Sequence, residues 1–206
     1  DAIDEISAQA WAATWFAPDV DTVFEIGGQD AKYLALADGR LTRFQMNRAC
    51  AAGTGAFLEE QSGRLGIDVQ RDFAAMALAA PMPVRLGSRC TVFMDSDLVH
   101  HLQHGASVPD LCAGLAYAVA RNYLDKVVGS RPIGRHVLFQ GGVARNEAVR
   151  AALCSLLGRD VTVPPHPEVS GAFGAALVAR ESAHLGDAPS GFRGFEAPTA
   201  PVSIRT

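Results

Sequence analysis

The sequence predicts an α/β domain with a mixed sheet and flanking helices. Three strand-like segments in succession open the domain after a first helix, and an Asp-Gly turn separates the second from the third. Helical segments dominate afterwards, and two further strand-like segments each lead into a helix. Hairpin and strand–helix connections together indicate antiparallel and parallel neighbours in one sheet.

Spacing and turn residues place the elements of the first half. Apolar residues recur at helical spacing over 1–13, and Pro18 ends this helix. Asp38-Gly39 is typical of a two-residue hairpin turn, because such a turn needs residues that tolerate positive φ. The strands around this turn are expected over 22–28, 31–36 and 41–46. The helices that follow are expected over 53–65, 72–80 and 90–104.

The second half alternates helices with short strands. A long apolar stretch predicts a helix over 109–128, and a strand over 136–140 then runs into a glycine pair. Asn146 is expected to cap a helix that Gly158 terminates. The remaining elements are a short strand at 161–163 and a final helix over 169–183.

Length and charge limit the classes of function. A chain of 206 residues with 49% hydrophobic residues suits one domain with a sizeable core. With 18 basic and 22 acidic residues, a net charge of -4 and no basic run, we expect no nucleic-acid partner. The apolar runs are too short to cross a membrane.

The chain begins with neither a signal peptide nor a methionine, so we expect a piece of a longer polypeptide. Within it we expect a connecting helix over 1–20, a domain over 21–185 and a flexible tail over 186–206.

The four cysteines have two kinds of surroundings. Without a secretory signal they indicate a reducing, cytoplasmic environment rather than disulfides. Cys112 and Cys154 lie among apolar residues on helical stretches and are expected to be buried packing. Cys50 and Cys90 each lie just before a helix, where the helix dipole favours a thiolate. A metal site needs about four ligands, and a two-fold dimer would supply two cysteines from each subunit.

The glycine turns suggest an anion site. Gly27 and Gly28 let backbone N–H groups approach an anion, while Gln29 or Asp30 could hold a metal-bound water. A second pair, Gly141-Gly142, could form a flat floor for a nucleobase or ribose. Each pair alone is equally explained by an ordinary turn.

Two glycines three residues apart, Gly171 and Gly174, fall inside the last predicted helix. Glycine costs about 1 kcal/mol relative to alanine there. Close helix packing and close passage of a ligand are the two explanations.

Five motifs in this order resemble a known family. They are Glu25–Lys32 (EIGGQDAK), Cys50–Gly55 (CAAGTG), Arg89–Phe93 (RCTVF), Gln140–Asn146 (QGGVARN) and Pro164–Glu168 (PPHPE). The sequence resembles the activators of 2-hydroxyacyl-CoA dehydratases and the ATPase subunits of benzoyl-CoA reductases, over about residues 4–183. The residue pairs Phe24-Glu25 and Phe139-Gln140 are more similar to those of the large fused activase-like proteins than to those of the small stand-alone activators. The order of the motifs is similar to that in the second half of the actin-like (RNase H-like) ATPases.

The resemblance implies ATP or ADP with Mg²⁺ at the turns, and a 4Fe–4S cluster that bridges a homodimer through Cys50 and Cys90. It implies an electron passed to a partner acyl-CoA dehydratase or reductase. The residues expected at the phosphates and Mg²⁺ are Glu25, Gln29 and Asp30. The residues expected along the nucleotide are Gly27, Gly28, Gly53, Thr54, Gly55, Gly141, Gly142, Asn146, Gly171 and Gly174.

The sequence departs from the family pattern in two ways. Glu25 stands where the family usually has Asp, and the first phosphate loop is absent. We therefore expect this chain alone to bind nucleotide weakly and to hydrolyse it poorly. Two alternatives stay open: a sugar or amino-sugar kinase of the same superfamily, and a non-catalytic, degenerate activase module.

Overall fold

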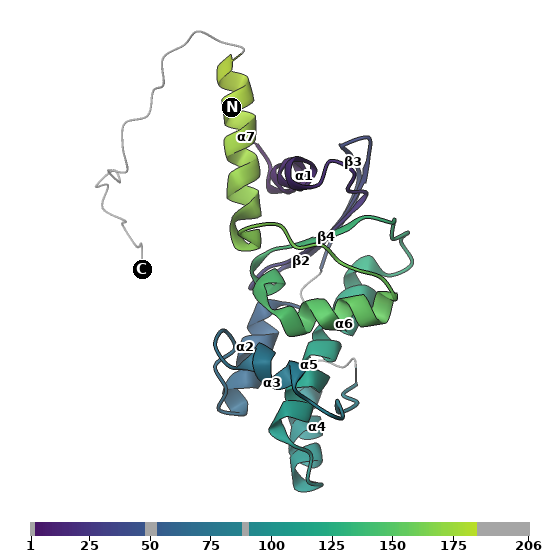
Figure 1. Cartoon of the computed structure of the whole chain (residues 1–206), viewed down its shortest axis with the longest axis vertical. Helices are drawn as coiled ribbons and strands as arrows, with labels where there is room; N and C mark the ends of the chain where they lie inside the picture. The colour runs from purple at the N-terminus through teal and green to yellow at the C-terminus, as the bar shows by residue number, and fades with distance from the viewer. Residues whose placement is uncertain (1–2, 48–52, 88–90, 185–206) are drawn as a thin grey trace, which may run out of the picture.

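The computed structural model describes residues 3–47, 53–87 and 91–184. Cys50, Cys90 and the predicted tail lie outside the described residues. A sheet crosses the middle of the molecule, with α1 (Glu5–Phe16) and α7 (Ser170–His184) on one side (Figure 1). Helices α5 (Val108–Tyr123) and α6 (Glu147–Leu157) lie on the other side.

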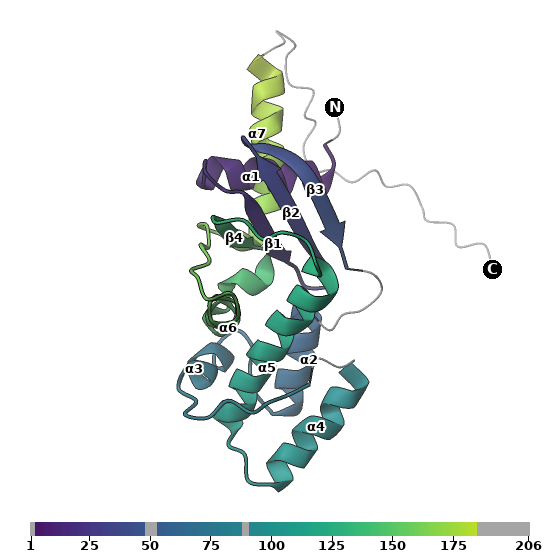
Figure 2. The ribbon, with the colours of Figure 1, turned by 90° about the vertical axis from the view of Figure 1, so that its right-hand side faces the viewer.

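The sheet has the strand order β3-β2-β1-β4 over the described part of the chain, and Figure 2 shows the strands side by side. The strands are β1 (Thr22–Ile26), β2 (Ala31–Ala37), β3 (Arg40–Met46) and β4 (Val137–Gln140). The first three pair in antiparallel fashion, and β1 pairs with β4 in parallel. The predicted mixed sheet is confirmed.

One predicted strand was wrong. Residues 161–163 form a single parallel bridge between Leu138 and Thr162 instead of a ladder. The segment has three residues before Pro164-Pro165, and proline has no N–H to extend a ladder.

Both faces of the sheet are covered by apolar packing. Val23, Leu34 and Leu138 form a cluster with alanines of α1 on one face. On the other face, larger side chains, including Phe24 and Phe139, pack against α5. Successive side chains along a strand point to opposite faces of the sheet, so neighbouring residues pack against different helix layers.

The local signals for turns and caps are confirmed. Asp38 and Gly39 have φ of 50° and 72°, as the hairpin turn requires. The side chain of Asn146 accepts hydrogen bonds at the start of α6, and Gly158 ends that helix with φ 63°. Helix α1 starts with Asp4 as its N-cap and runs to Phe16, beyond the predicted end at residue 13.

The remaining elements mostly pack against α5. They are α2 (Gly55–Arg64), α3 (Phe73–Leu78), α4 (Thr91–Gln103), η1 (Leu124–Val128), η2 (Gly142–Arg145) and η3 (Pro167–Val169). The single helix predicted over 109–128 is an α-helix followed by one π turn, η1, which Gly129 ends. Among the described helices, none is long and apolar enough to cross a membrane.

Candidate functional site

The two glycine turns lie at the same end of the sheet. Strand β1 leads into the turn at 27–30, and β4 leads into Gly141. Because β1 and β4 are parallel neighbours, their carboxyl ends share one edge, which is where open α/β sheets bind ligands. The sheet therefore brings together two turns that are more than a hundred residues apart in the sequence.

The backbone of both turns requires glycine or leaves room for a ligand. Gly141 has φ +91°, and a Cβ there would collide with the carbonyl oxygen of Ile26. Around Gly28 and Gly142, nothing lies within 4 Å of where a Cβ would stand. These positions expose peptide groups at the edge of the sheet, as close approach of a phosphate or a ribose requires.

A cluster of charges lies beside the first turn. The ammonium group of Lys32 is fully buried, at 2.9 Å from Glu5, 3.0 Å from Glu25 and 2.9 Å from Asp30. Glu25 is buried, whereas the side chains of Glu5 and Asp30 are 56% and 43% exposed. Gln29 is exposed at the tip of the turn.

Burial and charge compete in this cluster. Burial raises the pKa of Glu25 to about 7, and the attraction of Lys32 only partly opposes this rise. Burial also acts to lower the pKa of Lys32, but its contacts with Glu5, Asp30 and Glu25 outweigh burial and raise that pKa. Lys32 is therefore charged at neutral pH. The cluster has three carboxyl groups around one ammonium group. When two of the carboxyl groups are ionised, its net charge is negative, and this charge attracts a cation.

The start of α2 is bonded directly to the first glycine turn. The N–H of Gly55 donates to the carbonyl of Gly27 at 2.9 Å, and the N–H of Ala56 donates to that of Gly28 at 2.7 Å. A Cβ at Gly55 would also press on Gly28, so glycine permits this approach. Gly55 is one of the residues expected along the nucleotide, but its N–H already donates to the protein backbone.

Gly53 and Thr54 lie on the α5 side of this contact. A Cβ at Gly53 would stand 3.1 Å from the backbone nitrogen of Tyr123, and Thr54 is fully buried. Both residues line a pocket of about 430 Å³ together with Asn122 and Arg131. Gly53 thus packs α2 closely against α5, and contact of either residue with a nucleotide stays a prediction.

Three of the residues predicted to line the nucleotide make contacts within the protein. Asn146 Oδ1 accepts from the backbone N–H groups of Ala148 and Val149, so it caps α6. Gly171 lies against the amide of Gln9, and a Cβ at Gly174 would collide with the carbonyl oxygen of Ala8. These contacts bear out the packing explanation for the glycine pair, and contact with a nucleotide stays a prediction.

Glu5 and Lys32 were not predicted as site residues from the sequence. Lys32 could have been found, because a hairpin centred on the turn places it opposite Glu25, as the register confirms. Glu5 could not, because its contact depends on how α1 packs on the sheet.

The structure describes the two cysteines that were expected to be packing residues. Cys112 is buried, and burial raises the pKa of its thiol to about 11, which makes it unreactive at neutral pH. Cys154 is half-buried on α6. Over the described ranges, no group of three or more His, Cys, Asp or Glu side chains is arranged to hold a metal ion. Cys50 and Cys90 lie outside those ranges.

The fold is that of an actin-like ATPase. The crystal structure of (R)-2-hydroxyglutaryl-CoA dehydratase component A from Acidaminococcus fermentans matches with a TM-score of 0.84 and 37% identity, over 88% of this chain and 70% of that one. The activator of the 2-hydroxyisocaproyl-CoA dehydratase from Clostridium difficile with bound ADPNP matches with a TM-score of 0.82 and 36% identity, over 91% and 71%. Xylulose kinase from Bifidobacterium adolescentis, at 17% identity and a TM-score of 0.50, shares the fold alone.

The chain belongs to the BadF/BadG/BcrA/BcrD ATPase family, whose model matches residues 1–179. It is 37% identical over 182 residues to the 2-hydroxyisocaproyl-CoA dehydratase activator of Clostridioides difficile, covering 88% of this chain and 68% of the relative. It is 38% identical over 184 residues to the (R)-2-hydroxyglutaryl-CoA dehydratase activating ATPase of Acidaminococcus fermentans, covering 88% and 69%.

Proposed function

We propose that this chain is the nucleotide-binding part of an ATP-dependent activator that donates an electron to a partner acyl-CoA dehydratase or reductase. The observation that carries the proposal is the pair of open glycine turns at one edge of the sheet, beside the carboxyl groups of Glu25 and Asp30. Membership of the ATPase family and the names of the dehydratase activators among its relatives support it.

The nucleotide would lie along this edge. Gly27 and Gly28 would approach the phosphates, while Gly141 and Gly142 would form the floor under adenosine, with Asn146 beyond them. Mg²⁺ is held in such sites by one or two carboxylates together with phosphate oxygens and water. The charged cluster has a net negative charge, and the side chain of Asp30 in it is half-exposed. Asp30 is therefore suited to hold Mg²⁺, with Gln29 and Glu25 as its neighbours.

Cys50 and Cys90 are proposed as the protein ligands of a 4Fe–4S cluster, two from each subunit of a homodimer in the cytoplasm. Such a cluster, when bound, supplies one-electron chemistry. The hydrogen bonds from the start of α2 to Gly27 and Gly28 support a link between the nucleotide and the cysteines. Cys50 precedes α2 by only a few residues, so a movement of the turn would be passed to its neighbourhood.

Anaerobic reconstitution with iron and sulfide tests this proposal. We expect about four irons per two chains, a dimer in solution, and loss of iron and dimer in Cys50→Ser and Cys90→Ser. Cys154→Ser, a change outside the proposed site, is the matched control and should bind iron like the original chain. Equal iron in all three variants, or none in the original chain, would contradict the cluster. A sugar kinase or a non-catalytic module should bind no iron.

A further inference from the structure

Three polar side chains form a row across the end of the sheet. Glu25 pairs in register with Lys32 of β2 on one side and with Gln140 of β4 on the other. All three are buried. Each lies two positions from Val23, Leu34 or Leu138 in its strand and therefore on the same face, which packs toward α1, so the row also faces α1.

Helix α1 contacts both ends of this row. Glu5 Oε1 lies 2.9 Å from Lys32 Nζ. One helical turn later, Gln9 Oε1 accepts a hydrogen bond of 2.6 Å from Gln140 Nε2, and the Gln9 carbonyl accepts a second of 3.2 Å. Residues four apart lie on one face of a helix, so one face of α1 holds both contacts.

Each end of the row continues into one glycine turn. Lys32 also holds Asp30, the last residue of the first turn, at 2.9 Å. Gln140 directly precedes Gly141, which begins the second turn. Helix α1 is thus connected to each turn through a single buried side chain.

We propose that Glu5 and Gln9 are positioning residues that transmit occupation of the two glycine turns to α1. This inference rests on the proposed nucleotide site. Lys32 carries one positive charge and shares it among three carboxyl groups, and charge-assisted hydrogen bonds of this kind are shorter and stronger than neutral ones. When a ligand binds Asp30, the ammonium group of Lys32 retains only Glu5 and Glu25 as partners. The strength of its ion pair with Glu5, and with it the position of α1, then changes.

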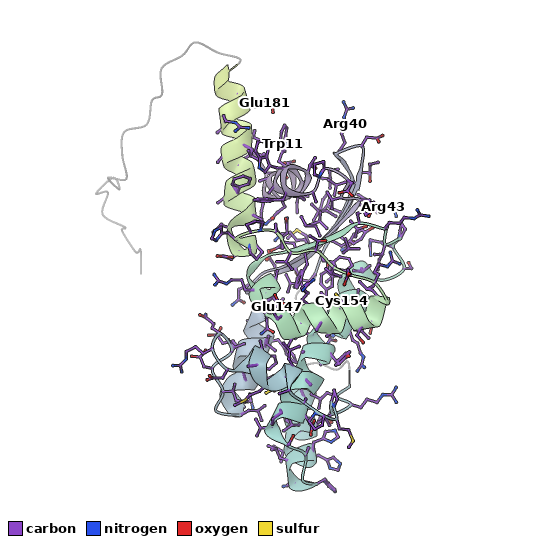
Figure 3. The ribbon with its side chains drawn as sticks, in the orientation of Figure 1. Trp11, Arg40, Arg43, Glu147, Cys154 and Glu181 are labelled. Atoms are coloured by element: carbon purple, nitrogen blue, oxygen red, sulfur yellow. The ribbon has the colours of Figure 1, made fainter. Side chains whose placement is uncertain are left out.

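The chain carries its own reporter for α1. Its 2 tryptophans, Trp11 and Trp15, both lie on α1, and they are 45% and 54% exposed. Trp15 packs near Phe173 of α7, with ring centroids 6.4 Å apart, and the guanidinium of Arg180 lies 5.0 Å from its ring. Trp11 lies in the same region, beside α7 (Figure 3). Tryptophan emission therefore reports the position of α1 against α7.

The test is a titration of the chain with Mg·ADP up to millimolar concentration. Binding is measured by equilibrium dialysis, and tryptophan emission is recorded on the same samples. We expect a saturable change in emission with the same midpoint as binding. In Glu5→Gln, whose side chain is half-exposed and whose fold we expect to be kept, most of the emission change should be lost at saturating Mg·ADP, whatever the midpoint of binding.

Two further variants make the result specific. Glu5→Asp keeps the charge and should restore part of the emission change. Glu60→Gln removes an exposed ion pair with Arg64 on α2 and should alter neither binding nor emission. Circular dichroism checks that each variant is folded.

The outcomes separate the two proposals. Absence of Mg·ADP binding by the original chain would refute the nucleotide site and this inference with it. Binding without a change in emission, or with the same change in Glu5→Gln, would overturn the inference alone.

Discussion

Glu25 lies buried at the end of β1, where its charge is costly even with Lys32 3.0 Å away. Its pKa of about 7 lies above the ordinary value of 4.5, because burial acts more strongly than the attraction of Lys32. The folded protein therefore holds this proton over a pH range in which the unfolded chain has lost it.

This raised pKa predicts how stability depends on pH. The contribution of Glu25 is fully present below about pH 4.5 and falls as pH rises to about 7, since the folded state binds more protons in that window. The loss is on the order of 3 kcal/mol, at about 1.4 kcal/mol per pKa unit. Glu25→Gln does not titrate, so urea unfolding of both proteins should show a difference that changes across this window. A constant difference between pH 5 and 7.5 would show that Glu25 is not perturbed.

Among single residues, the sequence predicted where the turn residues lie but not the charged contacts around them. Gly28, Asp30 and Gly142 could be placed because turn residues carry their own signal. The buried state of Lys32 could not, because it depends on α1 lying over the end of the sheet, a tertiary contact with no local pattern.

The crossing of α1 and α7 is the contact between elements that depends most on one residue. A Cβ at Gly174 would collide with the Ala8 carbonyl oxygen, a backbone atom that cannot rotate away. We therefore expect Gly174→Ala to destabilise the protein by about 1–3 kcal/mol, the usual cost of overpacking.

Gly63→Ala is the matched control for this change. Gly63 lies in the last turn of α2 with nothing within 4 Å of a Cβ, so alanine should stabilise the helix by up to about 1 kcal/mol. Thermal unfolding of the two variants should give shifts of opposite sign. If Gly174→Ala were as stable as the original chain, the close crossing of α1 and α7 would be wrong.

Elements with strong local signals were predicted well, and elements that depend on context were not. The hairpin and α6 carry turn and cap residues that determine their ends. The strand expected at 161–163 reduces to one bridge because proline follows at once, and the helix over 109–128 changes to a π turn near its end, which apolar spacing does not reveal.

Across the whole molecule, the sheet joins the two glycine turns, α1 covers one of its faces, and α7 packs against α1. Motif order predicted this arrangement because each turn follows a strand, and parallel neighbours end at the same edge. The order of the motifs alone does not show where the turns leave room for a ligand. In the structure, that room lies at Gly28 in the first turn and at Gly142 in the second.

We propose that a nucleotide binds at these two turns. The most direct measurement is a titration of the ¹⁵N-labelled chain with Mg·ADP, followed by the amide signals of its glycines. We predict weak binding, with a dissociation constant near or above about 0.1 mM, and saturable shifts at Gly28 and Gly142 but not at Gly63. Shifts confined to other surfaces, or no shift at millimolar Mg·ADP, would contradict the account.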